Sequence, residues 1–565
     1  MSISTRHPST WLLLLIVAIF GATLGTGCKK KNKEAPPVDP AAAHTDTLRI
    51  LSERVPADAS SALFIVDFSA AMASYQGLRT RISTYMGDFA SIEADLRNTL
   101  GVDPARPQNL VQIGVAPQGG AFCSVVQDQP LCGVLLSDAN TFEKHFERVL
   151  QSQPFNLRAP VVRSALPGGG QLLRFATDEG GELKAAIVVT EAMGFVILRP
   201  RAEAIEGLAA TLENPAAQPL SEHAPFKQLL AHTSSESIVA WLSPNASAAA
   251  IRTITKLGDR LPSMDNIEGV LIGVKLSADA IHGWFSAKID PNDERVRALL
   301  SRSEGVQAAD FSKLVTDDAY VLVRARTEPS SLLETLRTAF TDDDVKNVEE
   351  TVKTTIGADD IEPRLLAVLG SDMMTVATRA RLLTLAGLAR GGSVNARALG
   401  DGLGLIMAYQ LKDSDGAKAL LQDIAASRPA NLTYIRDDLG ERWSVETGVA
   451  AGTLLLIQDG LLVASTKRQL GDILQMLAAE EAPTITEISA QEALDLRTKT
   501  EDIGMFIDLK RVANNSIGQI AGGKLSPSMR EAVQIFDEFW MRADVVDSEW
   551  LDGTYRIQLS TPARL

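Results

Sequence analysis

The sequence predicts an α+β protein built from two tandem copies of a mostly antiparallel β-sheet unit, with helices packed on one face. Three observations support this prediction: the chain length, an ordered series of repeated landmarks, and apolar runs separated by short turns. A chain of 565 residues is too long for one hydrophobic core, which favours two or more domains. The 45% apolar and 22% charged residues are typical of a folded protein.

The repeated landmarks define the two copies. Each landmark is short, but all recur in the same order in both halves of the chain, which indicates an internal repeat. The matched pairs are Val55–Ala59 with Val315–Ala319, Leu78–Thr80 with Leu336–Thr338, Gly101–Asp103 with Gly357–Asp359, Leu136–Asp138 with Leu411–Asp413, and Glu236–Leu242 with Glu501–Ile507. The alternative is two unrelated domains that share a rhythm of strands and helices.

The elements within a copy alternate between hairpins and helices. Apolar runs at Ala121–Val126 and Leu131–Leu136 flank the turn Gln127–Pro130, which predicts a hairpin. Asp138 is placed to cap the following helix. That helix has an apolar stripe of Phe142, Phe146, Val149 and Leu150, matched in the second copy by Ala417, Leu420, Leu421 and Ile424. Further strands are predicted at Gln171–Ala176, Leu183–Thr190 and Gly194–Leu198, with closing hairpins at Val270–Ile289 and Trp540–Leu559. Short turns between neighbouring strands favour an antiparallel sheet.

The N-terminus has the layout of a secretion signal. Arg6 and His7 precede Trp11–Phe20, an apolar run of ten residues that is too short to span a bilayer. The run leads to Leu24-Gly25-Thr26-Gly27-Cys28, which resembles the lipobox of bacterial lipoproteins. In that family the cysteine receives a diacylglycerol and becomes the new N-terminus. Gly25 stands where the family prefers Leu. The alternatives are an ordinary cleaved signal with an incidental cysteine, or an uncleaved signal anchor.

The residues after Cys28 predict a tether. Four lysines between positions 29 and 33 can contact anionic headgroups, and the Pro/Ala stretch Ala35–Ala43 lacks the apolar bulk to fold. The expected organisation is a signal peptide over 1–27, the lipidated cysteine and flexible tether over 28–47, and repeat units over 48–305 and 306–565. By the resemblance, Lys29 after the cysteine favours the outer membrane, with the periplasmic or surface face left open.

The body of the chain resembles a family of uncharacterised bacterial proteins, the domain-of-unknown-function 3352 family. The resemblance rests on Pro56–Ala59, on Val66-Asp67-Phe68 after the first strand, on Gly101–Pro104, and on the tandem copies. It covers most of residues 48–560 and implies no established activity.

Composition and motifs argue against several functions. A net charge of −15 repels phosphate backbones, so nucleic acid is not expected as a partner. None of the six histidines pairs at the spacing of a metal site, so no metal or other cofactor is expected. His145-Phe146-Glu147 matches the H-x-E of zinc deaminases but lacks their cysteine motif. His145 is therefore expected to be a solvent-exposed helix residue.

Cys123 and Cys132 are expected to form a disulfide. Export places the chain where disulfides persist, and these two cysteines remain once Cys28 is used. If Asp128 and Gln129 form the turn, Cys123 and Cys132 face each other directly, within disulfide range. The alternative is two buried free thiols, because a shift of one residue in register would separate them.

The copies differ most between their central strands. The second copy has an insert, Arg379–Asp401, whose apolar stretch is flanked by cations in an otherwise acidic protein. The candidate interaction residues are Arg381, Leu382, Leu383, Leu385, Leu388 and Arg390. An exposed apolar segment rimmed by cations is typical of a partner or membrane contact. The alternative is that the leucines pack onto their own domain.

These features predict a membrane-anchored envelope lipoprotein that is not an enzyme and that binds a partner protein or supports surface structure. Two other functions stay open: a periplasmic carrier of lipids or small molecules, and an enzyme whose active-site residues are dispersed. An open apolar cavity would favour the carrier, and converging His, Asp or Ser side chains would favour the enzyme.

Overall fold

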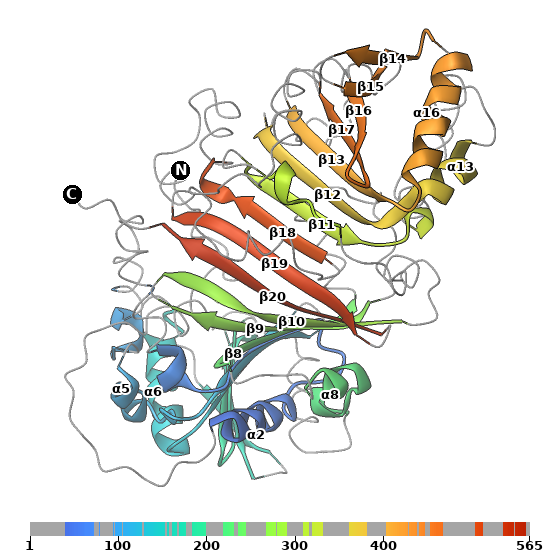
Figure 1. Ribbon diagram of the computed structural model, residues 1–565. Coiled ribbons are helices and arrows are strands. Elements are labelled where there is room, and N and C mark those ends of the chain that lie inside the picture. The colour runs from blue at the N-terminus through green and yellow to red at the C-terminus, as the bar shows by residue number, and fades with distance from the viewer. Residues whose placement is uncertain are drawn as a thin grey trace, which may run out of the picture. The chain divides into compact units, whose positions relative to one another are not determined.

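Antiparallel β-sheet dominates both units into which the chain divides in the computed structural model (Figure 1). The first unit comprises Met1–Ser247, Ile267–Lys288 and Gln558–Leu565, and the second comprises Ala248–Asn266 and Ile289–Ile557. The structure describes most of residues 40–290 and 309–560, with larger gaps at 79–93, 199–217, 245–266, 332–360, 381–402, 467–502 and 512–534. The expected boundary between 305 and 306 lies outside the described residues.

The sheet of the first unit is open, and its described strand pairs from β4 through β9 are antiparallel. In sheet order the strands are β4 (Val161–Ala165), β5 (Gln171–Ala176), β6 (Leu183–Val189), β7 (Met193–Leu198), β3 (Gln129–Leu135), β2 (Ala121–Val126), β1 (Ser61–Ile65), β8 (Ile238–Leu242), β9 (Ile267–Leu276) and β10 (Ala280–Ile289). The first strand, β1, thus lies in the middle of the sheet, and the later strands are added on both sides of it.

The second unit has a sheet of the same strand order. Its strands are β14 (Leu432–Asp437), β15 (Gly440–Val445), β16 (Thr453–Gln458), β17 (Leu461–Thr466), β13 (Leu403–Leu411), β12 (Leu369–Ala380), β11 (Val321–Arg326), β18 (Ile503–Asp508), β19 (Phe536–Val546) and β20 (Trp550–Leu559). The described pairs from β14 through β19 are again antiparallel. Each strand of the first unit therefore has a counterpart at the same place in this sheet.

Helices cover both faces of the first sheet, so the expectation of helices on one face is wrong for this unit. Phe64 and Ile65 are neighbours on β1 and so point to opposite faces. Ile65 belongs to the core under helix α6 (Ala139–Gln151). Phe64 instead contacts Phe226 of α8 (Ala224–Leu230), with ring centroids 6.1 Å apart. Figure 1 shows α6 and α8 on different sides of these strands. Because strands such as β6 are apolar on both faces, both faces need a cover.

The second unit buries both faces of its sheet too. Helix α16 (Ser414–Ser427), beside α13 (Ile361–Val368), packs over one face in a core that includes Trp443. On the other face a short segment with the 3₁₀ turn Ser312–Leu314 packs against the central strands. The core there includes Leu322, Met374 and Val463. The two sheets thus have the same strand order and a matching helix, α6 or α16, on one face, but they differ in what covers the other face.

An aspartate begins the main helix of each unit. The Thr141 backbone N–H donates to the Asp138 side chain over 2.9 Å, which confirms the predicted cap of α6. The Gly416 N–H donates to Asp413 over the same 2.9 Å. Each bond satisfies an N–H that the helix leaves without an internal partner. The bond from Thr141 also lowers the pKa of the Asp138 carboxyl.

Helix α2 (Pro40–Ser52) shortens the expected flexible tether. The sequence analysis placed the tether over residues 28–47, but the helix begins at Pro40. Proline is favourable in the first helical turn, and the following alanines have the highest helix propensity. Leu48 and Leu51 of α2 are fully buried in the first unit, which anchors the helix.

We expect Gly194→Ala to lower the free energy of unfolding of the first unit by about 1–3 kcal/mol, because a Cβ at this position of β7 would overlap the Phe142 ring. Phe142→Leu should relieve the overlap, so the double variant should lose less stability than the two single variants together. Urea denaturation of the four proteins measures both effects. Strict additivity would contradict the contact.

Candidate functional site

Two predicted sites lie outside the described residues. Cys28 precedes the first described residue, and the six candidate interaction residues between Arg381 and Arg390 lie between β12 and β13. The flanking strands are described: β12 ends at Ala380 and β13 begins at Leu403. Met373 and Tyr409 are cross-strand partners in this pair. The insert therefore connects adjacent antiparallel strands.

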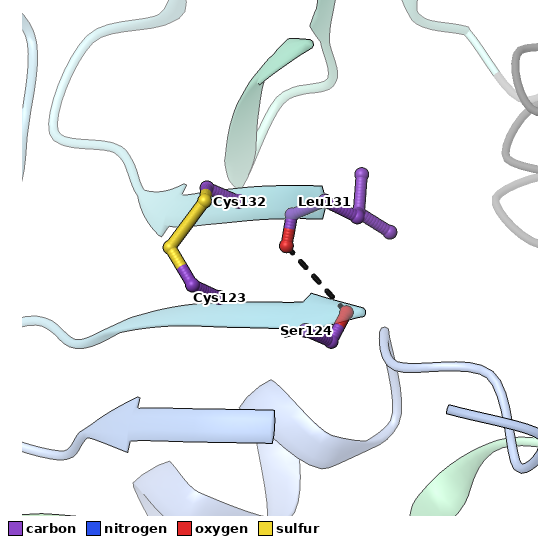
Figure 2. The surroundings of a disulfide bond; sticks show 4 residues. All are labelled: Cys123, Ser124, Leu131 and Cys132. Carbon is purple, nitrogen blue, oxygen red and sulfur yellow. Dashed lines mark hydrogen bonds between the residues drawn. A yellow bond between two sulfur atoms is a disulfide. The ribbon is translucent and has the colours of Figure 1, made fainter. Parts of the chain in front are cut away.

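Cys123 and Cys132 lie directly opposite each other on β2 and β3, with Cα atoms 4.1 Å apart and sulfur atoms at disulfide distance (Figure 2). The register is the one predicted from the turn. The neighbouring Ser124 Oγ donates to the Leu131 carbonyl over 3.5 Å. Neither cysteine is fully buried, which differs from the alternative of two buried thiols.

The two cysteines belong to a cross-strand row that crosses the centre of the first sheet. Cys123 faces Leu63 on β1, and Cys132 faces Val196 on β7. Directly opposed residues of antiparallel strands point to the same face. We call Leu63, Cys123, Cys132 and Val196 the cysteine row; all four are half-buried. The pair thus lies on an apolar face, between two interior strands.

A buried ion pair forms the polar centre of the second unit. Arg324 on β11 is 2% exposed and Asp372 on β12 is 0% exposed. The guanidinium binds the carboxylate through two nitrogens, with Nη2 to Oδ2 at 2.6 Å and Nε to Oδ1 at 3.1 Å. Such a fork-to-fork arrangement is strong and directional. Sequence alone did not indicate this pair, because Arg324 and Asp372 are 48 residues apart in the chain.

The ion pair holds a separate segment of chain against the sheet. The Ala309 N–H donates to Asp372 Oδ2 over 2.9 Å, and Arg324 Nη2 donates to the Ala309 carbonyl over 3.1 Å. The guanidinium also lies 5.1 Å from the centre of the Phe311 ring. Each of the two buried charges therefore makes a hydrogen bond to the Ala309 backbone, and these bonds offset part of the cost of desolvation.

The first unit uses apolar groups at the matching position. Phe64 stands where the second unit has Arg324, by cross-strand register with β8 and β18. Gly120 stands where the second unit has Asp372, next to the paired strands. A Cβ at Gly120 would lie 2.8 Å from Leu51 Cδ1 of α2, so the helix occupies the space of a side chain. At the matching positions, the first unit therefore packs apolar side chains of α2 and α8, whereas the second unit binds the backbone of Ala309 through an ion pair.

His145 is buried, so the expectation that it is solvent-exposed is wrong. It is 6% exposed and lies on the face of α6 that also buries Phe142 and Phe146. Arg148 Nη2 lies 3.0 Å from His145 Nδ1. Because arginine can only donate, this nitrogen accepts and the ring is neutral. Burial lowers the pKa of His145, and the charge of Arg148 lowers it further. The histidine is therefore a core residue.

No group of three or more His, Cys, Asp and Glu side chains that could hold a metal ion occurs among the described residues. Within the same part of the chain, no helix is long and apolar enough to cross a membrane.

Comparisons with known proteins identify no family. No family model matches the chain, and no curated protein matches it. Among solved structures, crystal forms III, IV and I of TP0453 are similar to it at 10%, 12% and 9% sequence identity. The matches cover 42%, 45% and 42% of this chain and 78%, 87% and 77% of TP0453, with TM-scores of 0.23, 0.24 and 0.24. A likeness this low supports no statement about fold or function.

We expect Arg324→Met to lower the free energy of unfolding of the second unit by about 3–5 kcal/mol, because it leaves the Asp372 carboxylate buried without its partner. Replacing both residues, Arg324→Met with Asp372→Leu, should recover part of the loss, because no charge is left buried but the Ala309 N–H and carbonyl still lose their partners. Arg364→Met is the matched control, because its partner Asp423 is exposed and the pair contributes no more than about 1 kcal/mol. Denaturant unfolding measures all three. A double variant as unstable as the single one would contradict this account.

Proposed function

We propose that the protein is a lipid-anchored lipoprotein of the bacterial cell envelope that binds another envelope protein and has no catalytic role. The observation that carries this proposal is the N-terminal sequence. A short cationic start, a ten-residue apolar run and a lipobox-like Leu24–Cys28 follow each other in the order of a lipoprotein signal. The proposed destination is the outer membrane, because Lys29 follows the cysteine and a residue other than Asp at this place favours it in similar lipoproteins.

The cysteine pair supports export. Disulfides persist in oxidising compartments and are rare in the bacterial cytoplasm. Cys123 and Cys132 lie at disulfide distance, on adjacent strands in register. A cysteine pair brought together in this way is what an exported protein is expected to contain.

The body of the protein is proposed to be two tandem copies of one ancestral unit. The common strand order supports this. So do the matched aspartate caps Asp138 and Asp413, which are also the matched landmarks of the sequence. Cross-strand registers agree with the landmarks as well: Leu63 faces Ala240, and Val323 faces Met505. Unrelated domains would have to reproduce order, register and caps independently.

The binding surface is proposed to be the insert of the second unit. Support comes from its composition, since leucines between residues 382 and 388 are flanked by Arg381 and Arg390 in a protein of net charge −15. The first unit replaces this insert with a short turn between β2 and β3. The copies thus differ in length where the insert lies.

The lipid anchor is tested by labelling. We expect radiolabelled palmitate to be incorporated into the wild-type protein in its native host and lost in Cys28→Ala, because the thiol is the acceptor. The control is Cys123→Thr with Cys132→Met, which should keep the label. Label that persists in Cys28→Ala, or is absent from the wild type, would refute the anchor.

The insert is tested by replacement. We expect substitution of residues 382–398 with a short Asn-Gly turn to abolish recovery of partner proteins cross-linked in the envelope, with almost no change in melting temperature. A second variant replaces the leucines at 382, 385 and 388 with glutamine and keeps the length, and it should lose the recovery as well. Unfolding of the replacement variant would show that the leucines are core. Unchanged recovery would show an ordinary connection.

A further inference from the structure

The cysteine pair lies between strands that are already held on both sides. β2 pairs with β1 as well as β3, and β3 pairs with β7 as well as β2. Six residue pairs, from Ala121 with Val134 to Val126 with Gln129, keep β2 and β3 in register. The covalent bond therefore crosses a ladder whose alignment does not depend on it.

The second unit forms the same cross-strand row without cysteines. Val323, Thr375, Met407 and Ala464 are successive partners across β11, β12, β13 and β17. They occupy the places of Leu63, Cys123, Cys132 and Val196. In this row Thr375 and Met407 lie opposite each other, and the strands pair in register all the same. The fold therefore builds this ladder without a disulfide at the position.

A covalent bond at this place gives a moderate stabilisation by cross-linking and is not required to form the ladder. A disulfide stabilises mainly by restricting the unfolded chain, and the effect is smallest for short loops. The loop between Cys123 and Cys132 is short, with a sequence separation of 9. The pair is half-buried, not sealed in a core. A partly exposed disulfide can be reached by an attacking thiolate.

We propose that Cys123 and Cys132 form a reversible thiol–disulfide exchange site whose co-reactant is a dithiol oxidoreductase. A thiolate of the dithiol attacks one cysteine sulfur, the bond between the two cysteines breaks, and a mixed disulfide forms. The released cysteine thiolate takes a proton from solvent. The second thiol of the dithiol then resolves the mixed disulfide. The protein gains two electrons and two protons, and the dithiol is oxidised to its disulfide.

The first test uses the full chain in mixtures of reduced and oxidised dithiothreitol, a dithiol of the proposed class. Iodoacetamide then traps free thiols, and peptide mapping locates them at Cys123 and Cys132. We expect full, reversible reduction under native conditions, with the melting temperature lowered by about 5–10 °C, the loss that a loop of this length implies. Resistance to reduction until the protein unfolds would overturn the proposal.

The second test transfers the residues of the second unit into the first. Cys123→Thr with Cys132→Met should fold with the same circular dichroism and a melting temperature about 5–10 °C below that of the oxidised protein, close to that of the reduced protein. Loss of the native circular dichroism, or a melting temperature lowered by more than about 15 °C, would show a structural staple and overturn the proposal.

A third measurement tests access to the sulfur. With Cys132→Ala, the remaining Cys123 should form a mixed disulfide with oxidised glutathione in the folded protein, detected by mass. No adduct would show a shielded sulfur and overturn the proposal. Because the reagents are added to purified protein and the modified residues are mapped, these results are independent of whether Cys28 is lipidated.

Discussion

The alternation of side chains along a β-strand governs the rest of this structure. Successive residues point to opposite faces, and directly opposed residues of neighbouring strands share a face. A sheet whose strands are apolar on both sides, as β6 is, then needs a cover on each side. The first unit meets this need with α6 on one face and α8 with α2 on the other. The cover, more than the sheet, is where the two units differ.

Local features of this fold could be predicted from sequence, and long-range ones could not. The β2–β3 hairpin, the Asp138 cap and the register that opposes Cys123 to Cys132 each depend on residues close in the chain. The second cover of the sheet depends on pairing between distant segments, which periodicity does not report. The Arg324–Asp372 pair could not be predicted for the same reason. Its partners are separated by 48 residues, and neither residue alone indicates a buried ion pair. The prediction for His145 was wrong because the buried face of α6 is wider than the apolar stripe from which it was predicted.

The matching positions of the two sheets show two ways to attach a covering segment. In the first unit, Phe64 packs with Phe226 and the absence of a side chain at Gly120 admits Leu51. This solution is apolar and tolerates changes of similar volume. In the second unit, Arg324 and Asp372 bind the backbone of Ala309, which is directional and sensitive to the loss of either charge. An ion pair of this kind specifies one position for the segment, whereas apolar packing depends on shape alone.

The cysteine row shows how a chemical group can be added to a sheet without altering it. Val323, Thr375, Met407 and Ala464 show that the ladder needs only side chains of moderate size at these places. Two cysteines meet that requirement, and direct opposition brings their sulfur atoms to bonding distance without any change of backbone. Because β2 and β3 are each paired on both sides, breaking the bond removes no hydrogen bond of the sheet. Opening and closing this bond therefore leaves the sheet in place, and an intact sheet is what a reversible exchange site requires.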